Sequence, residues 1–205
     1  MTIRTASLVV FSLSILFLII TVVTMIQLNK NDEIREVVEG ENHYYLSVLS
    51  QLRRVSERAT LSIRAYSLSQ DSKFSEDYKK AKEDFYISKE SKEKFENVWR
   101  AFSKMEKIEE SALKYIKEGN NLKNATELLF SVDYYQFKYD LIYLVDEAEQ
   151  SIKMSRTQQL SEIDKTRELL KTVIMILISI IILLNIAHYL FLVQLESKIL
   201  ENSIL

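Results

Sequence analysis

Four arginines lie close together in the first third of the chain: Arg53, Arg54, Arg58 and Arg64. On a helix, spacings of three to four residues bring side chains onto one face, which groups Arg54 with Arg58 and, less closely, with Arg64. A guanidinium group binds a carboxylate through two parallel hydrogen bonds. The cluster is therefore a candidate site for a small anionic ligand. The alternative is ordinary salt bridging to Asp and Glu of neighbouring helices.

A second group suited to recognition is aromatic, and it comprises Tyr134, Tyr135, Phe137, Tyr139 and Tyr143. A tyrosine offers apolar area together with a hydroxyl that forms hydrogen bonds, so it serves both ligand sites and helix cores. We expect Tyr134 and Tyr135 to contribute to the same ligand site as the arginines, with core packing as the alternative.

The sequence contains few residues suited to catalysis or metal binding. The chain has no cysteine, two glycines and two histidines, His43 and His188. It therefore has no thiol nucleophile or thiolate metal ligand, and it assembles neither a Ser-His-Asp set nor a phosphate-binding glycine loop. His188 lies in an apolar run three residues after Asn185. A polar residue at such a position indicates either a helix–helix contact in a dimer or haem ligation. We expect no catalytic residue, no metal and no cofactor, and thus no enzymatic activity.

Two long runs of the sequence, residues 5–29 and 172–195, carry no charge. About 20 apolar residues in a helix are enough to cross the hydrocarbon of a bilayer. The pattern predicts transmembrane helices at residues 7–28 and 172–194. The alternative for the first is a signal peptide, although its apolar stretch is longer than a signal core and no Ala-x-Ala-like cleavage site follows Met25.

Two spans place both ends of the chain on one side of the membrane. Arg4 precedes the first span, and the segment that follows this span, residues 31–41, is mostly acidic. Because cytoplasmic loops carry the excess of Lys and Arg, this distribution predicts cytoplasmic ends. We expect a cytoplasmic N-terminus at residues 1–6, an extracytoplasmic domain at 29–171, and the start of a cytoplasmic linker at 195–205 with no output domain. The expected location is a bacterial inner membrane, crossed twice.

The domain between the spans is expected to be all-α. The chain has no proline, and Leu, Ile, Glu, Lys and Ser recur with helical spacing. Apolar residues repeat every seven positions at the start of this domain, as in a bundle or coiled coil: Val38, Tyr45, Leu52, Ala59 and Tyr66. This stripe also predicts a parallel homodimer through the first helix.

Interruptions of the pattern divide the domain into helices. The first lies at residues 69–72, where Asp71 or Ser72 would cap the next helix by accepting its free N–H bonds. A turn is also needed near residues 87–91, with Ser88 as its cap, because the last helix must return to the membrane.

The later helices follow from similar signals. Gly119 and Asn120 form a stop for the third helix, and residues 121–130 read as a short helix. The last helix starts near Ser131 and should run without a break into the second span. The predicted fold is an up-down-up-down four-helix bundle continuous with two transmembrane helices.

Residues 64–71 read Arg-Ala-Tyr-Ser-Leu-Ser-Gln-Asp and are followed by Phe74 and Tyr78. This run resembles the first-hairpin segment of the four-helix-bundle sensor domains of bacterial methyl-accepting chemotaxis receptors. In that family an Arg-x-Tyr run meets a Thr-Gly-Asp turn and an aromatic pair. Residues 125–134 resemble the entry to the family's last helix. The chain departs from the family in having Gln70 where the family often has glycine.

This resemblance implies a transmembrane sensory receptor module that detects an extracytoplasmic ligand or partner and passes a helix shift across the membrane. It implies a homodimer in contact with membrane lipid, and either a small anionic ligand or a periplasmic binding protein as partner. One alternative is the input module of a sensor histidine kinase or diguanylate cyclase. Another is a non-enzymatic, membrane-anchored helical scaffold that docks a partner protein. The net charge of −2 argues against a general nucleic-acid binder.

Overall fold

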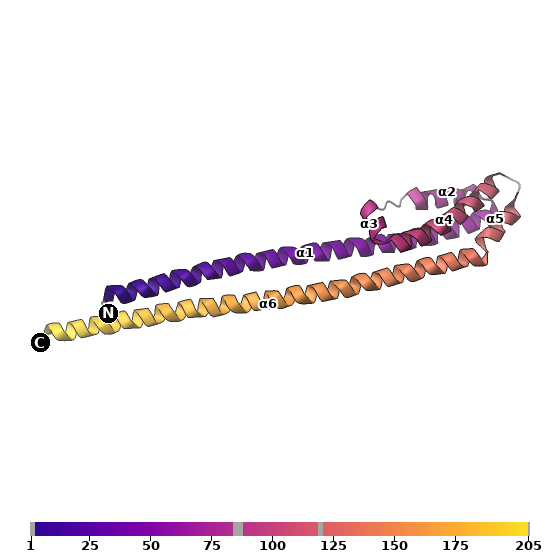
Figure 1. Cartoon of the computed structure of the whole chain (residues 1–205). Helices are drawn as coiled ribbons and strands as arrows, with labels where there is room; N and C mark the ends of the chain where they lie inside the picture. Colours follow the sequence, from indigo (N-terminus) through magenta and orange to yellow (C-terminus); the bar gives the residue numbers. More distant parts are fainter. Residues whose placement is uncertain (1–2, 84–87, 119–120, 205) are drawn as a thin grey trace. The chain divides into compact units, whose positions relative to one another are not determined.

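The structure of the protein is a computed structural model, and it describes residues 3–83, 88–118 and 121–204. Over these residues the chain is all-α, with six helices and no strand (Figure 1). The helices are α1 (Ile3–Ser69), α2 (Ser72–Glu83), α3 (Lys89–Lys94), α4 (Glu96–Lys117), α5 (Leu122–Leu129) and α6 (Val132–Ile204). The all-α prediction is therefore confirmed.

Two of the helices, α1 and α6, are each long and apolar enough to cross a membrane. Their most apolar stretches reach a mean hydropathy of 2.8 and 2.7. Both helices continue well beyond these stretches, as the ranges of α1 and α6 show (Figure 1). The expected continuity of the last helix with the second apolar run is thus confirmed.

The structure divides into two compact units. We call Met1–Val38 together with Gln158–Leu205 the paired-helix unit, and Glu39–Thr157 the core unit. In the paired-helix unit, Arg167 Nε lies 2.9 Å from Asp32 Oδ1, and the Asn31 amide donates a hydrogen bond of 3.0 Å to a backbone carbonyl of α6. Ser7 Oγ and His188 Nε2 lie 3.2 Å apart. His188 therefore makes a helix–helix contact inside one chain.

The core unit is held by one apolar cluster to which α1, α2, α4, α5 and α6 all contribute. Its most deeply buried apolar side chains are Leu49 and Ile63 of α1, Tyr78 of α2, Met105 of α4, Leu129 of α5, and Tyr134, Leu141 and Val145 of α6. Burying one side chain of Leu or Ile size contributes ~1.5–3 kcal/mol. This cluster is therefore the main source of stability in the core unit.

The seven-residue stripe on α1 faces this core. Leu52 is 2% exposed, and Tyr45 and Ala59 are buried with it. Tyr45, Leu52 and Ala59 therefore pack inside their own chain, and the homodimer stays a prediction. A homodimer through α1 would have to use the opposite, exposed face of the helix.

The turn between α1 and α2 is built around a residue in the left-handed region. Gln70 has φ 58°, the one non-glycine residue with positive φ among those described. Asp71 follows it, and its Oδ1 accepts a hydrogen bond of 3.0 Å from the backbone N–H of Lys73. The predicted capping role of Asp71 is confirmed.

The predicted cap at Ser88 is also confirmed. Its hydroxyl oxygen accepts a hydrogen bond of 3.2 Å from the backbone N–H of Ser91, at the start of α3. Phe95 then separates α3 from α4. Residues 84–87, with part of the expected turn, lie outside the described residues, as do Gly119 and Asn120.

Candidate functional site

A carboxyl group is buried in the centre of the core unit. Glu109 of α4 is 2% exposed, although its neighbour Glu110 is exposed. The reason is helical spacing: Glu109 lies four residues after Met105 and three before Ala112, and all three belong to the buried face of α4. A polar group in such a place needs hydrogen-bond partners to be tolerated.

Two hydroxyl groups from other helices supply these partners. The Tyr134 hydroxyl donates a hydrogen bond of 2.6 Å to Glu109 Oε1. The Thr60 hydroxyl lies 3.3 Å from the same oxygen and 2.9 Å from the Tyr134 hydroxyl. Thr60 belongs to α1 and Tyr134 to α6, so this network joins three helices of the core unit.

Burial raises the pKa of Glu109 to about 7, because a charged carboxylate loses its hydration there. The hydrogen bonds from Tyr134 and Thr60 and the charge of Lys82 act in the opposite direction. Lys82 is a weak counter-ion for this group, since its Nζ lies 2.6 Å from a Glu106 oxygen and 2.9 Å from a Glu110 oxygen. The carboxyl of Glu109 therefore changes charge near neutral pH.

Tyr78 of α2 completes the cluster. Tyr78 is 2% exposed, and its hydroxyl lies near the Glu109 carboxyl, although the geometry falls outside that of an ordinary hydrogen bond. Burial, followed by the nearby charge of Glu109, raises the pKa of this hydroxyl above its usual value. We call Thr60, Tyr78, Glu109 and Tyr134 the buried polar cluster, with one residue each from α1, α2, α4 and α6.

The predicted ligand residues fall into two groups. Arg64, Tyr134 and Tyr135 come together: the Arg64 guanidinium lies 5.1 Å from the Tyr134 ring centre and 4.6 Å from that of Tyr135. Arg64 also donates two hydrogen bonds, of 3.1 and 2.9 Å, to the carbonyl oxygen of Leu129, the last residue of α5. A cation at a helix C-terminus satisfies carbonyls that have no helical partner. The contacts of Arg64 thus stabilise the end of α5.

Arg54 and Arg58 form the second group. Both are exposed, and both line an open groove of about 600 Å³ between α1 and α2. Arg64 is not among the lining residues, whereas Phe74 and Asp77 supply the α2 wall. Arg54 and Arg58 therefore share one face of α1, as their four-residue spacing predicts. Arg64 lies outside this groove.

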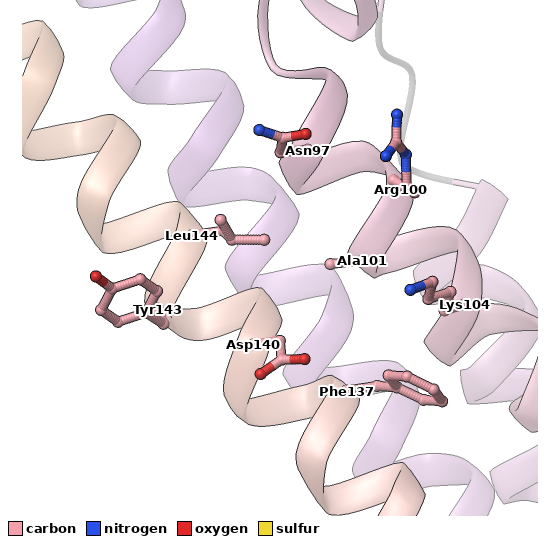
Figure 2. Close-up of a pocket in the computed structure, with 8 residues that line it drawn as sticks. All are labelled: Asn97, Arg100, Ala101, Lys104, Phe137, Asp140, Tyr143 and Leu144. Atoms are coloured by element: carbon pink, nitrogen blue, oxygen red, sulfur yellow. The ribbon is translucent and has the colours of Figure 1, made fainter.

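A smaller groove of about 290 Å³ lies between α4 and α6 (Figure 2). The eight lining residues come equally from the two helices: Asn97, Arg100, Ala101 and Lys104 from α4, and Phe137, Asp140, Tyr143 and Leu144 from α6. Arg100 lies 2.5 Å from Glu96 of its own helix, and Asp140 accepts a hydrogen bond of 2.8 Å from Gln136. Because Arg100 and Asp140 have partners on their own helices, and Lys104 Nζ lies 5.5 Å from the centre of the Phe137 ring, this groove is the weaker candidate for an ionic ligand.

Metal binding has no candidate site in the described ranges, 3–83, 88–118 and 121–204. No group of three or more His, Asp and Glu side chains is placed there to hold an ion. His188 has Ser7 as its neighbour, and both lie in the apolar parts of α1 and α6. The described part of the core unit thus offers a buried carboxyl at Glu109 and a groove whose charged lining is Arg54 and Arg58 together with Glu57 and Asp77.

The sequence pattern did not predict the buried polar cluster, although Tyr134 belongs to the aromatic group that it singled out. α4 contains several glutamates, and Glu109 differs from the others only in its position on the apolar stripe of the helix. Thr60 carries the same signal, because it lies on the buried face of α1 between Ser56 and Ile63.

The chain was compared with protein-family models, curated proteins and solved structures, and none matches it.

Proposed function

We propose that the chain is a transmembrane sensory receptor module of the chemoreceptor type, with the core unit on the outer side of a bacterial inner membrane. Helix continuity supports this most directly. α1 and α6 each hold a membrane-length apolar stretch and residues of the buried core in one unbroken helix. A change of packing around the core residues of α6 would then be passed along the same helix to its apolar stretch.

In this proposal α1, α2, α4 and α6 form an up-down-up-down four-helix bundle. The shared apolar core supports it, and so does the buried polar cluster with one residue from each of these helices. The left-handed Gln70 also fits the resemblance, because the family often has glycine at this turn and glycine adopts positive φ without strain.

The proposed ligand is a small anion bound by Arg54 and Arg58 in the α1–α2 groove. Both guanidinium groups are exposed beside apolar Leu61 and Phe74, and this combination suits a carboxylate with a short apolar part. The same face of α1 carries the exposed side chains of Leu61 and Leu68 at a seven-residue spacing. A second copy packing on this face would make a parallel homodimer with the arginines near its seam.

Signalling in such a module needs two packings of the bundle that differ by a few kcal/mol, with the ligand binding one of them better. A fusion protein tests this. The full chain is joined to the cytoplasmic part of a receptor kinase, with zero to four alanines inserted at the junction to sample one helical turn.

The fusion series is compared with and without Val145→Ala, which opens a void in the core, and with Glu147→Ala as an exposed control on the same helix. A sensory module predicts that Val145→Ala changes kinase activity in at least one junction length and that Glu147→Ala does not. If every fusion has the same activity with and without Val145→Ala, the chain is a membrane-anchored scaffold and the proposal is wrong.

A further inference from the structure

We infer that the Glu109 carboxyl is a proton-binding site, and that taking up a proton there changes how α1, α2, α4 and α6 pack around the buried polar cluster. The inference deepens the proposed sensory function by naming a stimulus, and it rests on that function for its biological role only. The chemistry is simple: a proton from solvent adds to a carboxylate oxygen, and no other reactant is needed.

The Glu109 carboxylate is solvated mainly on one side. The two hydrogen bonds of ordinary geometry that reach it in the described structure end on Oε1, from Tyr134 and from Thr60. A buried carboxylate has room for about four hydrogen bonds on its two oxygens. The anion is therefore only partly satisfied in a site that is 2% exposed, and protonation removes the larger part of this penalty.

Charged groups lie around the buried polar cluster on α1, α2, α4 and α6. They are Glu57 and Arg64 of α1, Lys82 of α2, Glu106 and Glu110 of α4, and Lys138 of α6, together with the phenols Tyr78 and Tyr134. Lys82 is shared by two other carboxylates, and Arg64 is bonded to the end of α5. Lys138 is partly buried, and its pKa is lowered by burial and by Arg64. No group in this set neutralises Glu109 as a dedicated partner.

The Tyr78 hydroxyl lies near the Glu109 carboxyl, and the Tyr134 hydroxyl is bonded to it. A phenol O–H donates a stronger hydrogen bond to a charged carboxylate than to a neutral carboxyl. Taking up a proton therefore weakens the links of α2 and α6 to α4, while it removes the cost of a buried charge. The two protonation states thus favour different packings.

The test uses the full chain in lipid nanodiscs between pH 5 and pH 9. Trp99 is the only tryptophan in the sequence and packs against Phe102 on α4, so its fluorescence reports on the core unit. We expect one transition near pH 7 in the wild type and none in Glu109→Gln, which should resemble the wild type at low pH throughout. Glu118→Gln, an exposed glutamate directly after α4 that pairs with Lys114, should keep the transition.

Hydrogen exchange in the same samples provides a second measurement. After correction for intrinsic rates, protection of core amides that exchange by global unfolding should fall on the order of 100-fold between pH 5 and pH 8 in the wild type. The fall should be absent in Glu109→Gln. A wild type with no fluorescence transition overturns the inference, and so does a transition that persists in Glu109→Gln, because it then belongs to another group.

Tyr134→Phe decides the matter if Glu109→Gln does not fold. The Tyr134 hydrogen bond favours the anion, so its loss should move the transition to higher pH, and an unchanged midpoint overturns the inference. These experiments measure packing and not signalling. A negative result in the kinase fusions with a positive result here would refute the sensory role and leave the proton site standing.

Discussion

The Tyr134 hydroxyl donates a hydrogen bond of 2.6 Å to the Glu109 carboxyl inside the core unit, and so ties α6 to α4. The helix that bears Tyr134 is also the helix that bears the second apolar run. Hydrogen bonds to a charged group contribute about 1.5–3 kcal/mol, more than neutral ones. The strength of this link between α4 and α6 therefore depends on the charge of Glu109.

The first prediction is that the free energy of unfolding falls as pH rises from about 4.5 to about 7. Glu109 has a pKa raised from 4.5 to about 7 in the folded chain. Between these values the folded chain holds a proton that the unfolded chain has lost, so the stabilisation is complete below pH 4.5 and is lost as pH rises through 7. Each pH unit in this window is worth up to ~1.4 kcal/mol, which gives a total on the order of 3 kcal/mol.

Denaturant unfolding of wild type and Glu109→Gln at pH 5, 6, 7 and 8 measures this dependence. The difference between the two proteins isolates the contribution of Glu109 from that of the other titrating groups. It should favour Glu109→Gln increasingly with pH. A difference that stays constant across the series contradicts the prediction.

A second prediction concerns Gln70→Gly. A non-glycine residue with φ near 58° is strained, at a cost of order 1–3 kcal/mol, and glycine removes the strain while losing ~0.5–1 kcal/mol through its greater freedom in the unfolded chain. The substitution should raise the free energy of unfolding by about 1 kcal/mol. Gln70→Val, which is β-branched, should lower it. Thermal melts of the three proteins decide the order, and a melting point of Gln70→Gly below that of wild type would contradict it.

The sequence was sufficient for the helices and their caps because these depend on local signals. Asp71 and Ser88 were predictable as caps from residue type and position, since both carry oxygens that accept a backbone N–H. The apolar stripes predicted which faces are buried. They did not predict what each face packs against, and for this reason Leu52 was assigned to a dimer seam although it lies in the core of its own chain.

The candidate site was harder to predict, because it depends on contacts between residues far apart in the chain. Arg58 and Arg64 look alike in the sequence, yet one lines an open groove and the other is bonded to the end of α5. Glu109 resembles any other glutamate of α4 until its position on the buried face is known. Composition and local pattern carry no information about such partners.

A third prediction tests the homodimer with single-cysteine variants, which are clean because the chain has no cysteine of its own. Leu61 is 68% exposed on the outer face of α1, whereas Leu52 is buried. Oxidation in native membranes should give a disulfide-linked dimer for Leu61→Cys and little for Leu52→Cys. Equal yields at the two positions, or none at Leu61, would count against a dimer through this face.

A fourth prediction tests the topology. Ser111 is exposed in the core unit, and Ser197 is exposed near the end of α6. On intact cells, a membrane-impermeant maleimide should label Ser111→Cys and spare Ser197→Cys, and both should react after the cells are opened. Labelling of Ser197→Cys alone on intact cells would show that the core unit is cytoplasmic.

The fifth prediction separates a ligand-binding arginine from a structural one. Arg64 donates two hydrogen bonds to the Leu129 carbonyl, so Arg64→Ala should lower the melting temperature of the full chain by several degrees. Arg58 is exposed in the α1–α2 groove, and losing an exposed salt bridge costs only ~0.2–1 kcal/mol. Arg58→Ala should therefore melt close to wild type.

The two arginines should differ again when anions are added, and this comparison decides whether the groove is a site. A panel of amino acids and dicarboxylates is titrated into wild type, Arg58→Ala and Arg64→Ala in nanodiscs, with the melting temperature as the measurement. At least one anion should stabilise wild type, because a ligand that binds only the folded state raises its stability by mass action. Arg58→Ala should lose this response, since removing one partner of a charge pair costs on the order of 2–5 kcal/mol of affinity. Arg64→Ala should keep the response from its lower starting temperature. If no anion shifts wild type, or if Arg58→Ala responds as wild type does, Arg54 and Arg58 are surface charges and the groove binds no anion.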